Sequence, residues 1–400
     1  MKGEAGRGLE YYKLAAQRVN GTPTLPAAGW MAWLDPRVAG FVRPLIVFVP
    51  IAIALHLSGG RVPAALKFAA ACLGIIPLAG LMGEATERLA ERLGPGIGGL
   101  LNATFGNAAE LIIALFALFR GYDEVVKASL TGSIIGNLLL VLGASIVAGG
   151  VKYKVQRFNK TAAGVGGTLM VLASIGLLIP ALYHKIVDTT KSGVPNLEHK
   201  LSVSVCLVLL ATYGLHLFFT LVTHKDLYNP AEEDGDLEDD PKAAPWGLQK
   251  SAWVLVGATV FVAILSEVLV SAVEPAGHAL GLSQTFMGLI VVAIIGNAAE
   301  HSTAILMARK DKMDLAVGIA MGSALQIALF VAPVLVFASY LRRKPMDLLF
   351  TTFEVVAVIL SVLIARMVAE DGESNWLEGA MLLMIYMILG LGFFYLPMGG

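Results

Sequence analysis

Two glutamates in apolar surroundings are the side chains of this sequence best placed to do chemistry. A Gly-Asn-Ala-Ala-Glu motif at 106–110 recurs 190 residues later at 296–300, and each copy lies within a long apolar run. An ionised side chain at the centre of a bilayer costs about 2.5–3.5 kcal/mol or more, so Glu110 and Glu300 are functional candidates. One isolated glutamate could be protonated and hydrogen-bonded to a neighbouring helix. Duplication of the whole motif argues against that structural explanation.

A pair of facing carboxylates gives a site of formal charge −2. A divalent cation neutralises this charge. Without the cation, repulsion between the like charges favours proton uptake. One site can therefore hold either a cation or protons, which is a chemical basis for exchange.

Neighbouring residues offer further oxygen ligands. Each motif asparagine stands three residues before its glutamate, on nearly the same face of a helix. Each motif glycine permits local unwinding, which would free main-chain carbonyls. The candidate cation- or proton-binding residues are Glu110, Glu300, Asn107, Asn297, Ser133, Ser323, Gly106, Gly296 and Thr104. Such oxygens suit Ca²⁺, Mg²⁺ or Mn²⁺. Close helix packing is the alternative role for the glycines, and a hydrogen bond to their own helix is the alternative for the serines.

Four further polar residues are candidates for an access path or a gate. Glu87 and Glu274 lie near the ends of apolar runs and could pass cations or protons to the centre, or could be ordinary helix-end charges. His301 directly follows Glu300 and could tune its protonation or serve only in packing. Gln326 follows the Gly-Ser pair at 322–323.

The chain's composition is that of a polytopic membrane protein. Of its 400 residues 56% are hydrophobic and 15% are charged, against about 25% charged in soluble domains. Cys72 and Cys206 lie in apolar runs and offer neither a disulfide framework nor metal-thiolate spacing. The predicted fold is an all-α integral membrane protein with eleven transmembrane helices. The predicted spans are 41–57, 64–90, 95–119, 124–148, 161–183, 200–222, 248–273, 283–308, 313–340, 347–368 and 376–397.

An internal duplication organises these spans. The Gly-Ser pair at 132–133 recurs at 322–323, at the same offset as the glutamate motif. Each repeat holds five spans, an odd number, so the two repeats are inverted in the membrane, and a substrate site is expected where they meet at the midplane. The predicted organisation is an N-terminal cytosolic arm (1–40), a leading helix (41–57), a first repeat (58–223), an acidic cytosolic loop (224–246) and a second repeat (247–400).

Loop charge predicts the orientation. With the N-terminus in the cytosol, the cytosolic segments hold the larger share of the 29 Lys and Arg residues, as the positive-inside rule requires. Arg342, Arg343 and Lys344 are a local exception on the other side. The acidic loop is interpreted as a solvated linker.

The motifs resemble those of a known family. The segments 99–110 and 296–301 resemble the two signatures of calcium/proton exchangers in the cation/calcium exchanger superfamily, and 310–315, 322–333 and 371–379 also resemble that family. The resemblance runs from about Phe41 to Pro397. It implies a central Ca²⁺ site on the two glutamates and proton-driven export of Ca²⁺ from the cytosol by alternating access. Ala293 stands where the family often has proline, and Gly136 stands where serine is common.

The leading hypothesis is therefore a Ca²⁺/H⁺ antiporter and not an enzyme. Ca²⁺ is its transported substrate, with no resident cofactor, and its partners are protons and the lipid bilayer, with no nucleic acid. Exchange against Na⁺ and transport of Mn²⁺ or Mg²⁺ stay open within the same class. A cation channel is the alternative from another class, but inverted repeats in one chain favour alternating access. An acidic vacuole-like organelle and a prokaryotic plasma membrane both fit, and the oligomeric state is left open.

Overall fold

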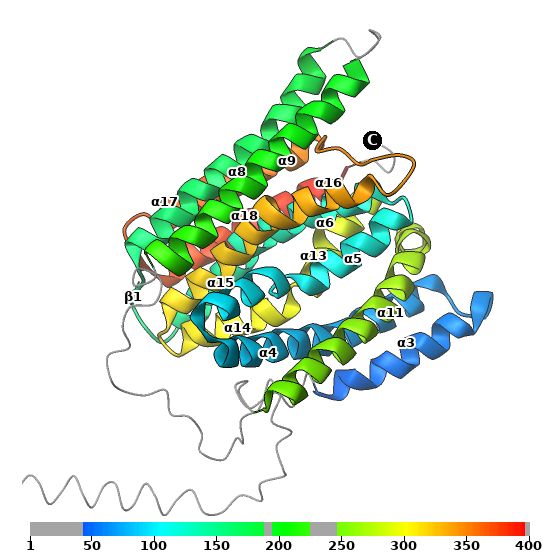
Figure 1. The fold of residues 1–400 in the computed structure, drawn as a ribbon, viewed down its shortest axis with the longest axis horizontal. Coiled ribbons are helices and arrows are strands. Elements are labelled where there is room, and N and C mark those ends of the chain that lie inside the picture. Colours follow the sequence, from blue (N-terminus) through cyan, green and yellow to red (C-terminus); the bar gives the residue numbers. More distant parts are fainter. Residues whose placement is uncertain (1–42, 188–193, 225–245, 397–400) are drawn as a thin grey trace, which may run out of the picture.

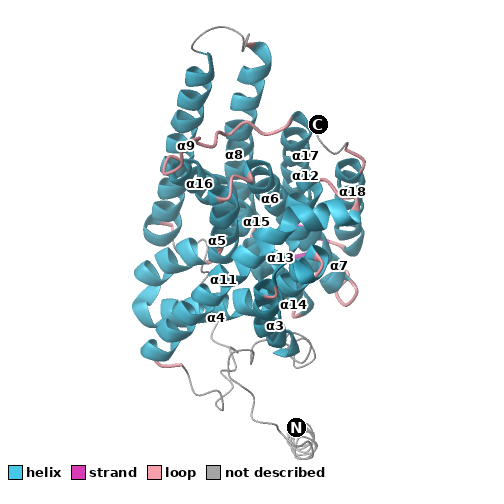
Figure 2. Ribbon diagram, turned by 90° about the vertical axis from the view of Figure 1, so that its right-hand side faces the viewer, coloured by secondary structure: helices cyan, strands magenta, loops and turns pink. Residues whose placement is uncertain are grey.

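The chain folds into a bundle of long helices, seen from two sides in Figures 1 and 2. This computed structural model describes residues 43–187, 194–224 and 246–396. The predicted arm 1–40 and almost all of the predicted acidic loop lie outside the described residues. In the described part, seven helices are long and apolar enough to cross a bilayer, and a bent helix pair makes an eighth such span. The protein is thus an all-α integral membrane protein.

Helices occupy most of each predicted span, with several limits shifted by five or more residues. The leading segment consists of η2 (Arg43–Val47), α3 (Phe48–Leu57) and η3 (Gly59–Arg61). The region of the first repeat contains α4 (Ala64–Phe105), α5 (Ala108–Phe119), α6 (Asp123–Ile135), η4 (Gly136–Val141), α7 (Leu142–Gly150), α8 (Lys160–Ile186), α9 (Val194–Phe218) and η5 (Phe219–Thr223). The region of the second repeat contains α11 (Leu248–Leu280), α12 (Gln284–Phe286), η6 (Met287–Val292), α13 (Ala293–Gly296), α14 (Ala298–Arg309), α15 (Met313–Gln326), η7 (Ile327–Val331), α16 (Ala332–Ser339), α17 (Thr352–Val368) and α18 (Trp376–Phe394). Strands β1 (Gln156–Arg157) and β2 (Glu373–Ser374) form an antiparallel pair.

Helix α4 covers the second predicted span and the start of the third. A Cβ atom added to Gly98 would lie 2.9 Å from the Cα atom of Ala90. In a straight helix, residues eight positions apart are about 12 Å apart along the axis. The helical chain therefore turns back on itself between these residues, and its two halves correspond to the two predicted spans.

The predicted start of the tenth span, at residue 347, is wrong. Helix α17 begins at Thr352, where Thr351 and Glu354 form a capping box. Leu348 and Phe350, which extend the apolar run in the sequence, lie buried in the preceding loop. Hydrophobicity alone therefore placed the helix start too early.

The two halves interlock around the centre of the bundle. Helix α14 packs against α7, α5 packs against α16, and η6 packs against α6. Helices α3, α4 and α11 pack together along one side of this arrangement, while α8 and α9 extend beyond the other helices (Figures 1 and 2). Both glutamate motifs lie in the interlocked region.

Ion pairs join the two halves at the predicted extracytosolic face. Arg342, in the loop before α17, pairs with Asp123 at 2.8 Å and donates a 2.6 Å hydrogen bond to the carbonyl oxygen of Leu118 at the end of α5. Lys127 pairs with Asp347 of the same loop at 2.6 Å. These contacts bind the Arg342 guanidinium within the protein, which explains why it departs from the positive-inside pattern.

A neutral side chain also joins the two halves, near the predicted cytosolic face. The buried Gln156 side chain donates a 3.1 Å hydrogen bond to the carbonyl oxygen of Ala308, near the end of α14. Ala308 stands 190 residues after Leu118, so equivalent carbonyl groups are capped at the two faces. One cap is a guanidinium and the other an amide, so the repeats share a geometry but not its chemistry.

Candidate cation-binding site

Both motifs lie at interruptions of a helix. Helix α4 ends at Phe105 and α5 begins at Ala108, so Gly106 and Asn107 form the first break. In the second half, Asn297 separates α13 from α14, and the segments on its two sides meet at 58°. This bend is present although Ala293 replaces the family's frequent proline. The Gly-Asn pair therefore suffices for the break in this chain.

The two glutamates occupy equivalent positions after these breaks. Glu110 lies in the first turn of α5 and Glu300 in the first turn of α14. Both side chains are half-buried, and their carboxyl groups interact electrostatically. Gly296 lies directly against Glu110, because a Cβ atom at this glycine would be 3.2 Å from the Cγ atom of Glu110. The carboxylate of the first repeat thus lies beside the break of the second.

The asparagine of each motif is hydrogen-bonded to the serine of the other repeat. Ser323 donates to the Oδ1 atom of Asn107 at 2.9 Å, and Asn297 donates from Nδ2 to the Ser133 hydroxyl at 2.9 Å. Asn297 also donates to the main-chain oxygen of Ala293 at 2.9 Å. The two breaks are therefore held together by reciprocal bonds, rather than each by its own repeat.

Two more amides complete this network. Asn137 donates to the Oδ1 atom of Asn297 at 3.1 Å and to the Ser323 hydroxyl at 2.9 Å. Gln326 accepts a 2.6 Å hydrogen bond from the Nδ2 atom of Asn107. The structure thus places Gln326 in the central cluster. Asn137 was not among the predicted site residues, and its place four residues after the first Gly-Ser pair was the available signal.

Two oxygen atoms in this region have no hydrogen-bond donor among the described residues. They are Oε2 of Glu300 and Oδ1 of Asn137, and both are shielded from solvent. Buried polar atoms are nearly always paired, so such atoms call for an explanation. An oxygen atom without a donor is free to ligate a cation. No three His, Cys, Asp or Glu side chains gather to hold a metal in the described ranges, so further ligands would be amide, hydroxyl or main-chain oxygens.

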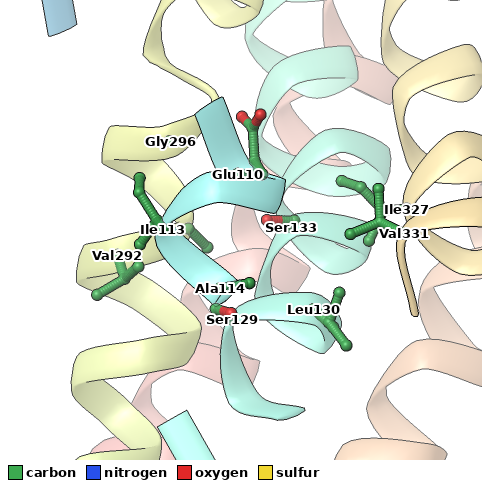
Figure 3. A pocket seen from close by; sticks show the side chains of 11 residues that line it. Glu110, Ile113, Ala114, Ser129, Leu130, Ser133, Val292, Gly296, Ile327 and Val331 are labelled. Atoms are coloured by element: carbon green, nitrogen blue, oxygen red, sulfur yellow. The ribbon is translucent and has the colours of Figure 1, made fainter. Parts of the chain in front are cut away.

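A small pocket leads away from Glu110 (Figure 3). Its walls are mainly apolar, with Ser129 and Ser133 as the other polar side chains. Ile113 and Ala114 follow Glu110 on α5, while Ser129 and Leu130 precede Ser133 on α6. All these lining residues lie towards the turn that joins α5 to α6. The pocket therefore extends from Glu110 towards the predicted extracytosolic face.

The remaining predicted residues lie outside the hydrogen-bonded cluster. Thr104 is exposed and donates to the main-chain oxygen of Leu100 on its own helix. Glu87 is exposed on α4. Glu274 lies on α11 beside Tyr122, and burial together with this carboxylate raises the pKa of Tyr122. His301 is half-buried next to Glu300 on α14.

The two Gly-Ser glycines differ in their surroundings. A Cβ atom at Gly132 would lie 2.6 Å from the Cα atom of Leu289, so this glycine permits close packing of α6 against η6. A Cβ atom at Gly322 would meet nothing within 4 Å. The packing explanation therefore holds for the first glycine only. A π-helical segment follows each pair, η4 in one half and η7 in the other, and such segments are frequent at functional sites.

Inverted repeats, two interrupted helices and a polar cluster between them define a secondary transporter. Comparison with known proteins specifies the family. The family model described as "Sodium/calcium exchanger protein" matches residues 63–222 and 250–395, one segment in each half. The chain belongs to this family.

Its relatives include named antiporters. The chain is 48% identical over 364 residues to a Ca(2+)/H(+) antiporter of Aphanothece halophytica, covering 88% of this chain and 96% of that protein. It is 45% identical over 359 residues to the Ca(2+)/H(+) antiporter ChaA of Bacillus subtilis, covering 88% and 99%. Among solved structures, native YfkE is similar with a TM-score of 0.75 and 41% identity, covering 89% of this chain and 100% of that one. These similarities place the chain among calcium/proton exchangers.

Proposed function

We propose that this protein exchanges Ca²⁺ for protons by alternating access at a site built on Glu110 and Glu300. The observation that carries the proposal is the meeting of the two motifs in one polar cluster, with an unpartnered carboxylate oxygen of Glu300. The antiporters to which this chain is nearly half identical over the aligned residues support the choice of ions.

The residues of the cluster suit a hard divalent cation. Ca²⁺ takes six to eight oxygen ligands at 2.3–2.6 Å. The two glutamates supply charge, and Oδ1 of Asn137 is a further acceptor without a donor. The positive ends of α5 and α14 lie at the two carboxylates and stabilise their negative charge. Asn107 and Asn297 use their amide groups mainly in bonds between the repeats, so they position the glutamates.

Protons and Ca²⁺ compete for the same two carboxylates. When Ca²⁺ leaves, two like charges remain close together in a low-dielectric region, and this arrangement favours protonation. The protonated pair is neutral, so the protein can change conformation without a bound cation. Exchange then follows from the site's chemistry, and no separate coupling device is needed.

The proposed direction is export from the cytosol, with the N-terminus on the cytosolic side. The excess of Lys and Arg on that side supports this orientation, and the pairing of Arg342 with Asp123 accounts for the main exception. The membrane is a prokaryotic plasma membrane or that of an acidic vacuole-like organelle, as the names of the bacterial and vacuolar relatives suggest.

Uptake of radioactive calcium into sealed vesicles with an acidic lumen tests this proposal. We expect uptake that collapses with a protonophore and that Glu110→Gln and Glu300→Gln each abolish. Glu124→Gln, at an exposed glutamate in the first turn of α6, is the matched control and should transport normally.

The same assay separates the alternatives. Sustained uptake in either site variant would overturn the assignment of the two glutamates. Uptake that ignores the pH gradient and follows an imposed Na⁺ gradient would overturn proton coupling, and a preference for Mn²⁺ or Mg²⁺ in competition would overturn the choice of Ca²⁺.

A further inference from the structure

Helix α14 is held at both ends by the first repeat. Directly before its start, Asn297 donates to the Ser133 hydroxyl at 2.9 Å. At its far end, Gln156 donates a 3.1 Å hydrogen bond to the carbonyl oxygen of Ala308. That carbonyl also accepts from the main-chain N–H of Asp311 at 3.1 Å. The Asp311 bond is local, whereas the Gln156 bond crosses between the repeats, so the helix of the second glutamate is fixed to the first repeat at each end.

The surroundings of Gln156 fix its side chain in place. The side chain is completely buried, and strand β1, to which Gln156 belongs, pairs with β2. The amide lies directly against the last turn of α7, because a Cβ atom at Gly149 would overlap its Nε2 atom. Helix α7 in turn packs along α14. The amide therefore lies between the end of α7 and the end of α14, and a side chain at position 149 would displace it.

The stability of the fold does not by itself account for a glutamine at position 156. The Oε1 atom of Gln156 is shielded from solvent and has no hydrogen-bond donor among the described residues. A buried acceptor without a donor destabilises a folded protein. Methionine, an apolar side chain of similar length, would avoid this cost, and the Ala308 carbonyl would keep its local bond. The distinctive contribution of the amide is thus its bond to α14.

The helix of the first glutamate has the corresponding arrangement. Asn107, directly before α5, accepts a hydrogen bond from Ser323 of the second repeat. At the far end of α5, Arg342 of the second repeat donates to the carbonyl oxygen of Leu118. Two unlike side chains therefore make the same kind of contact in the two halves. This repetition indicates that the contact serves the glutamate helices and is not an incidental bond of one loop.

We propose that Gln156 is a positioning residue of the cation site, because its bond to Ala308 sets the position of α14 and thereby of the Glu300 carboxylate. Glu300 lies in the first turn of α14, which has 12 residues and is about 18 Å long. A displacement of the far end of so short a helix reaches its first turn. Ligands must be held within about 0.5 Å of their productive geometry, so this displacement weakens cation binding. The inference rests on the proposed function, in which Glu300 is a ligand.

Equilibrium binding of radioactive calcium to the full-length protein in detergent, at one fixed pH, tests this role without transport. Gln156→Met removes the donor and should raise the Kd about two- to tenfold, the contribution of one hydrogen bond. Gly149→Ala should displace the amide and also raise the Kd. Because both variants act on one contact, the double variant should bind like the weaker-binding single variant, without multiplication of the two effects. Two controls should bind like the parent protein: Gly164→Ala, whose added Cβ atom meets nothing within 4 Å, and Ser202→Ala, which removes a buried hydrogen bond from the main-chain N–H of Leu348.

Hydrogen exchange of the main-chain amides at the end of α14 shows separately whether this end is released. We expect faster exchange there in Gln156→Met than in Ser202→Ala. Unchanged exchange in Gln156→Met, faster exchange with the parent's Kd, or an equal rise in Kd in Ser202→Ala would each overturn the positioning role. Parent-like calcium binding in Glu300→Gln would instead count against the proposed function, and the exchange measurement would still decide whether Gln156 holds α14.

Discussion

Replacing Gly296 with alanine tests the geometry of the central site more sharply than removing a charge. The added Cβ atom would lie 3.2 Å from the Cγ atom and 3.3 Å from the Oε1 atom of Glu110. Ordinary contacts of this kind are 3.4–4 Å long. The Glu110 side chain must therefore move by a few tenths of an ångström, while the surrounding backbone can keep its conformation.

The Gly296→Ala substitution is expected to weaken Ca²⁺ binding. Overpacking of a tight site costs about 1–3 kcal/mol, which corresponds to about a five- to 150-fold change in an equilibrium constant. Because the displaced group is a proposed ligand, the half-saturating Ca²⁺ concentration should rise by a factor in this range. Gly106→Ala would be a poorer test, since its Cβ atom would lie 2.8 Å from the main-chain oxygen of Asn102 and would disturb the helix itself.

The assay is the Ca²⁺ dependence of initial uptake in vesicles with a fixed pH gradient. Gly318→Ala, on α15, is the matched control, because nothing lies within 4 Å of its added Cβ atom. This control should transport with the parent's Ca²⁺ dependence. If Gly296→Ala folds, inserts and shows that same dependence, the position of Glu110 does not determine binding and the proposed site is refuted.

Two further predictions concern the predicted extracytosolic face. Arg342→Ala should lower the free energy of unfolding by about 1.5–3 kcal/mol, the range for hydrogen bonds to charged groups, because the 13% exposed side chain binds two partners. Thermal unfolding in detergent measures this change, and Arg343→Ala, at an exposed neighbour, should alter it little. Equal effects of the two substitutions would contradict the reasoning. Arg120 forms an ion pair with Glu267 that joins the turn after α5 to α11, and both side chains are partly solvated. Arg120→Glu should therefore lower the free energy of unfolding by at most about 1 kcal/mol and alter the uptake rate up to about fivefold. The double variant with Glu267→Arg should restore the rate. Lack of restoration would show that the pair does not link these elements.

The glutamate motif could be found from the sequence because a carboxylate within the membrane is energetically unfavourable. A carboxylate within an apolar run is expensive wherever it points, so Glu110 and Glu300 stand out without knowledge of the fold. The repeat offset then identified their asparagines and serines. The helices could be located for a related reason: backbone groups in lipid must be bonded within a segment, so long apolar runs have few alternatives.

The contacts between the two halves could not be predicted from hydropathy or from the repeat. Asn137 and Gln326 are one register position apart when the repeats are aligned, so symmetry gave no reason to place both in one cluster. The structure joins them through Asn107, Asn297 and Ser323, over separations of more than 150 residues in most cases. Such bonds depend on how helices interlock, and hydropathy carries no information about that. The start of α17 was misplaced for a similar reason, since a buried loop and a helix end can be equally apolar.

The two halves of the site are related but not equivalent, and this bears on alternating access. Glu110 lines a pocket, whereas the Oε2 atom of Glu300 is shielded and has no donor among the described residues. In an inverted-repeat transporter, the opposite-facing state is expected to exchange the environments of the two repeats. Glu300 would then face a pocket, and Glu110 would be the shielded carboxylate. The amides around them cannot exchange in the same way, because Asn137 aligns with Ile327 and Gln326 aligns with Gly136. The two states must therefore hold the motif asparagines with different bonds, and we expect them to differ in stability and in affinity even when the ion concentrations on both sides are equal.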